Sequence, residues 1–191
     1  MSKKLNTREI MISALLISLG IIIPMFSPVK IILEPASFTL GSHIAIFIAM
    51  FISKTSATLV ALGTTLGFFI GGFPLTVVVR ALSHVVFARI GASYIEKNKE
   101  KMESFKTQTI FSLVTGIIHG LCEVIVIIPF YISTSLSAQY YDQGFLQSVL
   151  LLVGVGTIAH SMVDFLFSTY IIKFLPKAAF VGENAVKTQN H

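Results

Sequence analysis

Long apolar runs, separated by short polar or proline-containing segments, dominate this sequence. A helix needs about 20 predominantly apolar residues to cross a membrane, and fewer if neighbouring helices shield its ends. On that measure the pattern predicts six spans, at about 7–25, 40–52, 55–70, 75–94, 109–132 and 145–174. We therefore expect an all-α integral membrane protein, a bundle of six transmembrane helices that forms a single domain over residues 1–191.

Signals at the ends of the runs support this division. Asn6 and Glu9 are spaced as a capping box before the first run, and Pro24 marks its exit into a loop. The second and third runs are short and joined by a very tight turn. This indicates helices partly enclosed by others, or a loop folded back over the outer mouth. The segment 96–106 is a plainly hydrophilic linker.

Composition makes lipid the solvent for most of the chain. Hydrophobic residues make up 54% and charged residues 12%, and the mean hydropathy is +0.83. Ordinary soluble domains carry about 25% charged residues, so a soluble fold of this composition is excluded. The single cysteine, Cys122, rules out an intrachain disulfide framework.

Basic residues predict the orientation in the membrane, because cytoplasmic loops carry the excess of lysine and arginine. With the N-terminus inside, every basic residue except Lys30 and Arg80 falls on the inner side. We therefore expect a multi-pass protein of the cell membrane with both termini in the cytoplasm. The net charge of +5 then reflects topology rather than nucleic-acid binding.

Ionisable side chains within the runs are candidates for function. Each costs about 2.5–3.5 kcal/mol to insert and usually faces a cavity or another such group. Arg80 and Glu123 each lie six residues from a proline at the outer end of their runs, roughly 9 Å deep. His84 and His119 are one helical turn deeper on the same faces. These four residues are expected to line one outward-opening pocket, which His43 and Phe38 join.

Two interpretations of this pocket stay open. In the first, Arg80 clamps an anionic or carbonyl-bearing ligand, the histidines bind a polar ring, and Phe38 stacks on it. In the second, Arg80 and Glu123 form a structural salt bridge, the histidines satisfy contacts between helices, and Phe38 is an interfacial anchor. The sequence does not decide between them.

The ionisable residues within the apolar runs also allow a catalytic or metal-binding interpretation. His119, Glu123, His160 and Asp164 offer acid-base or metal groups for an intramembrane metal-dependent enzyme, which is one alternative function. Their spacing is loose and no soft cysteine or methionine cluster accompanies them, so no catalytic residue, metal ligand or cofactor is assigned. The sequence has no nucleotide-binding loop, so the energy for any uphill transport comes from elsewhere. A stand-alone secondary carrier is the other alternative.

Small residues recur at the spacing of close helix contacts. Ser13, Ala14 and Ser18 form a stripe on the first helix, and Gly63 and Gly67 form a GxxxG motif on the third. Such stripes serve either packing within the chain or docking onto another membrane protein.

Together these features resemble the substrate-binding S components of energy-coupling factor (ECF) vitamin importers, over nearly the whole chain. The resemblance rests on segment 36–43 leading into 48–53, on segment 80–84, and on the small stripe of Ala14 and Ser18. The family motif has alanine at both stripe positions, and Ser18 departs from it conservatively. The segments are similar to the subgroup assigned to niacin uptake, with pyridoxine or hydroxymethylpyrimidine carriers as near alternatives.

The resemblance implies a binding protein rather than an enzyme. It would capture a small heteroaromatic B vitamin or precursor on the outer face, and niacin ranks first because its carboxylate suits Arg80. It would then dock through Ala14 and Ser18 on a transmembrane scaffold (T) subunit powered by two cytoplasmic ATPase subunits. Toppling in the bilayer would release the ligand inside.

Overall fold

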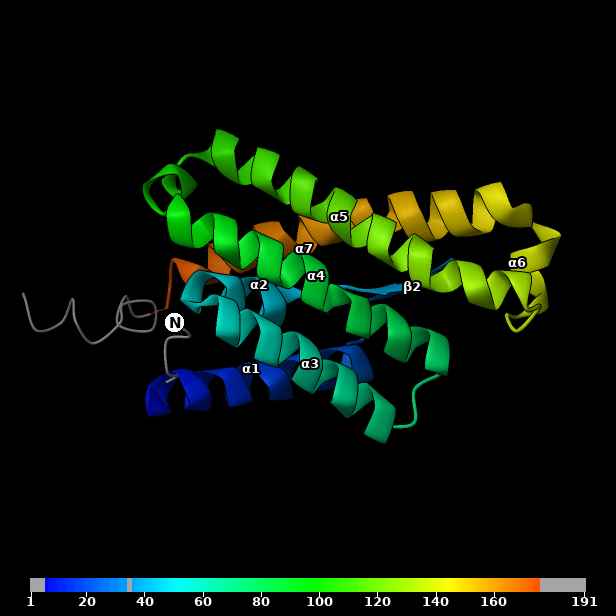
Figure 1. Cartoon of the computed structure of the whole chain (residues 1–191), viewed down its shortest axis with the longest axis horizontal. Helices are drawn as coiled ribbons and strands as arrows, with labels where there is room; N and C mark the ends of the chain where they lie inside the picture. Colours follow the sequence, from blue (N-terminus) through cyan, green and yellow to red (C-terminus); the bar gives the residue numbers. More distant parts are fainter. Residues whose placement is uncertain (1–5, 34–35, 176–191) are drawn as a thin grey trace, which may run out of the picture.

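The computed structural model describes residues 6–33 and 36–175, and it is a helical bundle (Figure 1). Its helices are α1 (Thr7–Phe26), α2 (Ile44–Ile52), α3 (Lys54–Ile70), α4 (Leu75–Lys97), α5 (Phe105–Ile132), α6 (Ala138–Asp142) and α7 (Gly156–Ile172). A short 3-10 helix, η1 (Glu100–Glu103), separates α4 from α5, and a π-helix, η2 (Leu146–Val155), continues directly into α7. The helical fold class expected from the sequence is confirmed.

Helix length qualifies the expected count of six spans. Within residues 6–33 and 36–175, four helical stretches are long and apolar enough to cross a membrane: α1, α4, α5 and the continuous stretch Leu146–Ile172. α3 is apolar but has only 17 residues, and α2 has nine. The expected start of the second span at residue 40 is wrong, because Leu40–His43 form a turn and α2 begins at Ile44.

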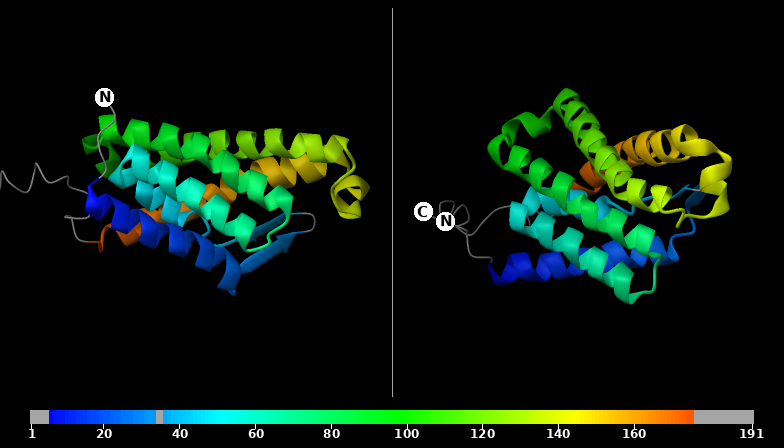
Figure 2. Two further views of the ribbon diagram at one scale, coloured as in Figure 1. Left: turned by 60° about the horizontal axis from the view of Figure 1, so that its bottom comes forward. Right: turned by 45° about the vertical axis from the view of Figure 1, so that its right-hand side comes forward.

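The connection between α1 and α2 is a β-hairpin rather than an irregular loop. Strands β1 (Lys30–Leu33) and β2 (Ala36–Thr39) pair antiparallel, with Ile31 opposite Phe38. The hairpin lies at the end of the bundle where α1 ends and α4 begins (Figure 2). Four-residue strands are too short to leave a clear alternation in the sequence, which is why the pattern indicated only a loop.

The short helix α2 occupies the centre of the bundle. Residues 45–50 are all buried, and α2 contacts α1, α3, α4 and α7. Phe47 packs against Phe87 of α4 and Phe165 of α7. A helix surrounded by protein does not need the full length of a membrane span, so the interpretation of the second run as an enclosed helix is confirmed.

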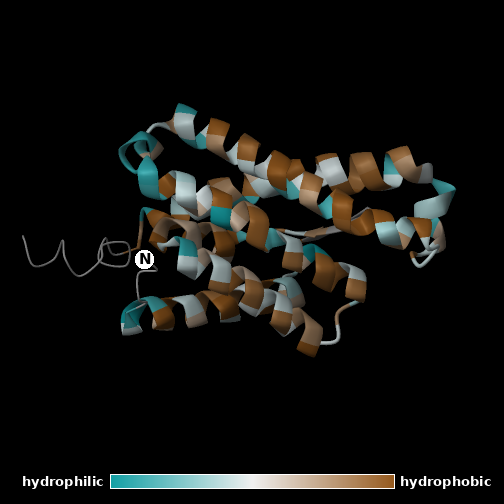
Figure 3. Ribbon diagram, viewed as in Figure 1, coloured by the Kyte–Doolittle hydropathy of each residue, from teal (hydrophilic) through white to brown (hydrophobic). Residues whose placement is uncertain are grey.

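Apolar side chains also cover the outside of the bundle. Large hydrophobic residues are exposed along the outer helices, among them Leu15, Leu66, Leu121, Ile125 and Leu166. Figure 3 shows hydrophobic residues along the length of the helices and hydrophilic residues where α1 begins and where α4 gives way to η1. An exposed apolar girdle with polar ends is the pattern of a membrane protein. α1 begins and α7 finishes at the same end of the bundle (Figure 1).

The two small-residue stripes have different surroundings. Gly63 and Gly67 of α3 face Ile17 and Ile21 of α1, and a Cβ atom added at Gly63 would lie 2.5 Å from Cδ1 of Ile17. The GxxxG motif therefore serves packing within the chain. On α1, Ser13 is buried, whereas Ala14 and Ser18 are exposed. The capping box is also confirmed at the start of α1, where Glu9 N donates to Asn6 Oδ1 at 2.7 Å.

Candidate functional site

A cavity of about 320 Å³ lies within the end of the bundle that carries the hairpin. Its apolar wall is formed by Pro24, Phe38, Ile46, Phe68, Phe73, Pro74, Val77 and Ala81. Its polar wall is formed by Thr39, Ser42, His43, Thr64, Arg80, His84, Glu123, Thr157 and His160. Apolar walls with a few converging polar groups are typical of small-molecule sites, and this volume is near the lower end of their range of about 300–1,000 Å³. The cavity therefore suits a small ligand.

Glu123 of α5 is the centre of the polar wall. Its Oε2 accepts hydrogen bonds from Arg80 Nη2 of α4 at 2.8 Å and from Thr157 Oγ1 of α7 at 2.6 Å. Its Oε1 lies 3.3 Å from His84 Nε2 and 3.4 Å from His119 Nε2. This buried carboxylate is thus held entirely by side chains, which come from three helices.

Arg80 has donor capacity left over. One Nη2 hydrogen is used by Glu123, but within the described part of the chain no acceptor pairs with Arg80 Nε, which is buried. Thr64 Oγ1, on the same cavity, is likewise buried without a partner there. Buried donors without partners are costly, so a side-chain rotation that turned either group toward the cavity would let a ligand oxygen pair with it.

Asp164 of α7 fixes the turn between the hairpin and α2. Its Oδ1 accepts a hydrogen bond from Gly41 N at 2.7 Å, and its Oδ2 accepts one from His43 N at 2.9 Å. His43 Nδ1 lies 3.0 Å from the same Oδ2. Gly41 has a φ of +85°, a conformation that favours glycine. Asp164 therefore caps the start of α2 from another helix, since His43 at the N-cap position makes no side-chain cap of its own.

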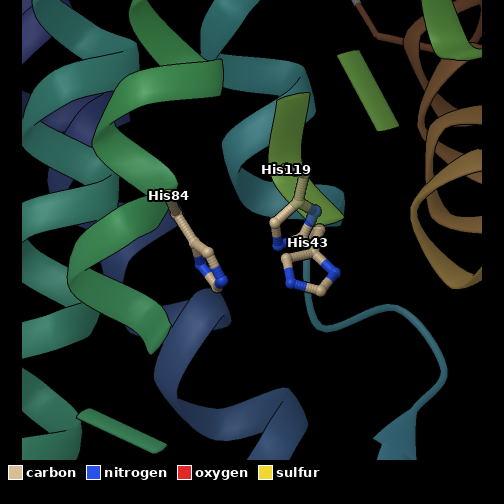
Figure 4. A group of neighbouring side chains, drawn as sticks. All are labelled: His43, His84 and His119. Carbon is tan, nitrogen blue, oxygen red and sulfur yellow. The ribbon is translucent and has the colours of Figure 1, made fainter. Parts of the chain in front are cut away.

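Three histidine rings meet beneath the cavity (Figure 4). The ring centroids of His43, His84 and His119 are 4.6–4.8 Å apart in each pair. His119 stacks on Phe87 with centroids 4.3 Å apart, and its Nδ1 lies 3.3 Å from Ser161 Oγ. The rings come from the start of α2, from α4 and from α5, so distant parts of the sequence build this cluster.

The structure brings the candidate residues of the sequence together, with one difference. Arg80, His84, Glu123, His43 and Phe38 all line the cavity, whereas His119 lies behind it and is completely buried. His119 is one turn deeper than Glu123 on α5, and the rings of His43 and His84 lie against it. Arg80 and Glu123 form an ion pair and also line the cavity, so the clamp and salt-bridge interpretations are compatible.

Sequence reasoning missed several lining residues. Ser42, Thr64 and Thr157 are small hydroxyl residues without any distinctive spacing, so nothing in the pattern separates them from packing residues. His160 was not among the residues expected to line the pocket, yet it lines the cavity, and its ring is 5.5 Å from that of Phe38. His160 lies one helical turn from Asp164 on the same helix face, and this spacing was the signal that could have placed it near the other buried polar groups.

Comparison with curated proteins finds a relative over most of the chain. The sequence is 41% identical over 177 residues to the niacin transporter NiaX of Lactococcus lactis subsp. cremoris, and the alignment covers 93% of this chain and 78% of that relative. This chain belongs to the NiaX family. Membership in the NiaX family confirms the resemblance to niacin-type S components and makes the chain a membrane transport protein. The relative is named as a transporter and not as an enzyme, which is consistent with a non-enzymatic role.

Two other comparisons add nothing to the NiaX assignment. No family model matches the sequence. No solved structure matches it either.

Proposed function

We propose that this chain is the substrate-binding S component of an ECF-type importer and that it captures niacin on the outer face of the cell membrane, without catalysis. The observation that carries the proposal is Arg80, a cationic side chain that lines a small cavity and is anchored there by Glu123 through Nη2. The relative named as a niacin transporter points to the same ligand.

Niacin matches the cavity group by group. Its carboxylate would pair with the guanidinium of Arg80, and its pyridine nitrogen would bond to Ser42 or a histidine, all of which line the cavity. Phe68 and Phe73, whose ring centroids are 4.6 Å apart, and Phe38 belong to the apolar wall and would pack against the ring. Pyridoxine and hydroxymethylpyrimidine, as neutral alcohols, would offer the guanidinium no charge beyond that of Glu123, whereas niacin adds a carboxylate. Niacin therefore ranks first.

We further propose six membrane crossings with both termini in the cytoplasm. α1 begins and α7 finishes at one end of the bundle, and the basic residues Arg8, Lys54, Lys97 and Lys173 lie at helix boundaries on that end. The cavity lies toward the opposite end, which would face outward by the positive-inside rule. α2 and α3 would complete the count as short crossings enclosed by protein.

The partner subunits are proposed to dock on α1. Ala14 and Ser18 are exposed, and the Ser18 hydroxyl is bonded within the helix to Ala14 O at 3.1 Å, which leaves a smooth small-residue surface. A transmembrane T subunit bound there would connect the chain to two ATPase subunits. Ser18→Trp should therefore abolish co-purification with the T subunit and niacin uptake in cells, while niacin binding by the isolated chain stays within about twofold. Loss of binding by the isolated chain would contradict a docking role.

Calorimetric titration of the purified chain in detergent tests the ligand, because the sequence has no tryptophan to report binding by fluorescence. Niacin should bind without nucleotide, and nicotinamide, which replaces the carboxylate by a neutral amide, should bind at least about tenfold more weakly. Equal affinity for niacin and nicotinamide would contradict the proposal that Arg80 binds the carboxylate. Niacin uptake by cells that lack T and ATPase subunits would favour a stand-alone carrier, and turnover of a bound substrate would favour an intramembrane enzyme.

A further inference from the structure

We propose that His43, His84 and His119 bind one divalent first-row transition metal ion at the floor of the cavity, with Glu123 or the ligand as the fourth donor. The metal site rests on the side chains themselves. Its part in holding niacin, by the carboxylate or the ring nitrogen, rests on the proposed function.

The three rings are placed as a preformed ligand set. Their candidate ligand nitrogens lie within 4.8 Å of one another, and all three residues are buried. In a tetrahedral zinc site with Zn–N distances of about 2.0–2.1 Å, the nitrogens are roughly 3.4 Å apart, so small ring rotations would close the set. The three rings point toward one another from separate helices (Figure 4).

The neighbours of the rings are those of metal-bound histidines. A ligating imidazole usually donates its other N–H to a carboxylate, a carbonyl or another polar oxygen. His43 Nδ1 lies 3.0 Å from Asp164 Oδ2, and His119 Nδ1 lies 3.3 Å from Ser161 Oγ. His119 Nε2 is completely buried and makes no hydrogen bond within the described part of the chain. With Nδ1 protonated toward Ser161, its lone pair faces Glu123 Oε1 at 3.4 Å, and a cation between the two atoms would be coordinated by both.

A second possible set, His43 with His160 and Asp164, is less suitable. Both oxygens of Asp164 already accept backbone hydrogen bonds, from Gly41 and His43. His160 Nε2 lies 3.0 Å from Ser42 Oγ. Metal binding there would break the contacts that hold the start of α2. The first set leaves those contacts intact, and there His84 would either give up the 3.3 Å contact of its Nε2 with Glu123 or bind the metal through Nδ1.

Charge favours a cation at this position. Arg80, Glu123 and Asp164 are the charged side chains in and around the described cavity wall, and together they carry one net negative charge. The carboxylate of niacin would raise this to two negative charges in a region of low dielectric, which is strongly unfavourable. One divalent cation brings the total to zero. Imidazole donors with an open fourth position are typical of zinc sites that accept an exchangeable ligand.

Metal titration of the full chain tests the site. Protein stripped with EDTA should bind one Zn²⁺ per chain, measured by calorimetry and elemental analysis, and Co²⁺ should give the visible absorption of a tetrahedral complex. His84→Gln and His119→Gln should each weaken Zn²⁺ at least tenfold, while His160→Gln should leave Zn²⁺ binding unchanged, whatever its effect on niacin. Absence of Zn²⁺ binding by the wild-type chain, or loss in His160→Gln with retention in His84→Gln, overturns the proposed site.

A niacin arm separates this inference from the proposed function. Niacin should perturb the Co²⁺ spectrum and should bind at least tenfold more tightly to Zn²⁺-loaded chain than to stripped chain. Tight niacin binding by a chain that takes up no Zn²⁺ would refute the metal site and leave the vitamin carrier intact. Stoichiometric Zn²⁺ without any niacin binding would support the site and count against the vitamin carrier. Unfolding midpoints of each variant, measured in parallel, identify any that fail to fold.

Discussion

Two buried acids, Glu123 on α5 and Asp164 on α7, have the same local sequence setting and different environments. Each follows a histidine by four residues, His119 and His160 respectively, and contacts it at 3.4 Å. Among the described residues, the partners of Glu123 are all side chains, chief among them Arg80. Asp164 is bonded by the backbone amides of the turn before α2. One acid arranges ligand-facing groups, and the other secures the chain.

The spacing of a histidine four residues before an acid is therefore the same at both positions, although one acid holds backbone amides and the other holds side chains. Backbone partners make an acid part of the fold, because no neighbouring residue can supply the lost acceptor. An acid whose partners are side chains on a cavity wall belongs to the site, because those side chains can bond to a ligand in place of the acid. Substitutions should therefore separate stability from binding at these two positions.

The largest expected effect is on stability, at Asp164. Asp164→Ala leaves the buried amides of Gly41 and His43 without an acceptor, and hydrogen bonds to a charged group contribute about 1.5–3 kcal/mol each. Unfolding free energy in detergent should fall by about 3 kcal/mol or more, as measured by thermal or denaturant unfolding. Asp142→Ala, at an exposed position, is the matched control and should change stability by less than about 0.5 kcal/mol. An unchanged unfolding midpoint in Asp164→Ala would contradict the structural role that distinguishes Asp164 from Glu123.

The next effect is on binding, at the partner of Glu123. Arg80→Ala removes the proposed anion clamp and should weaken niacin about 100-fold, or about 2.7 kcal/mol, with little change for nicotinamide. Titration calorimetry of both ligands measures the difference. Arg89→Ala, on the same helix but exposed, should leave both affinities unchanged. Similar losses for the acid and the amide would show that Arg80 only supports the fold.

The smallest effect should come from shortening Glu123 itself. Glu123→Asp keeps the charge but withdraws the carboxylate by about 1.5 Å, so Arg80 Nη2 and Thr157 Oγ1 lose their present geometry. We expect niacin affinity to fall about tenfold while the unfolding midpoint moves little, measured by calorimetry and thermal unfolding on the same samples. A large drop in the midpoint with retained affinity would place Glu123 with Asp164 among the structural acids.

Local pattern predicted much of the helical framework. Apolar run length located the helices to within a few residues at most ends, and Asn6 with Glu9 marked the start of α1. The same pattern missed the hairpin, whose strands are four residues each, and the π-helical stretch Leu146–Val155, for which no sequence signal was recognised. The start of α2 was also placed too early, because Leu40 is apolar although it lies in a turn.

The candidate site was predictable only where helix geometry acts alone. Depth and face placed Arg80, His84 and Glu123 together because each lies on a regular helix. The bond between Asp164 and Gly41 joins residues 123 positions apart, and no local rule anticipates it. For the same reason Thr157, which donates to Glu123 across the interface of α5 and α7, could not be distinguished from a packing residue.

The brevity of α2 has a consequence for transport distance. Nine helical residues rise roughly 14 Å, about half of a hydrocarbon layer of about 30 Å. The remaining depth above its first residue is taken up by the hairpin and the hollow beneath it. His84 lies ten residues along α4, again roughly 14 Å from its start. In the orientation proposed above, a solute resting on that ring lies about midway through a layer of this thickness, so about half of the distance across it remains.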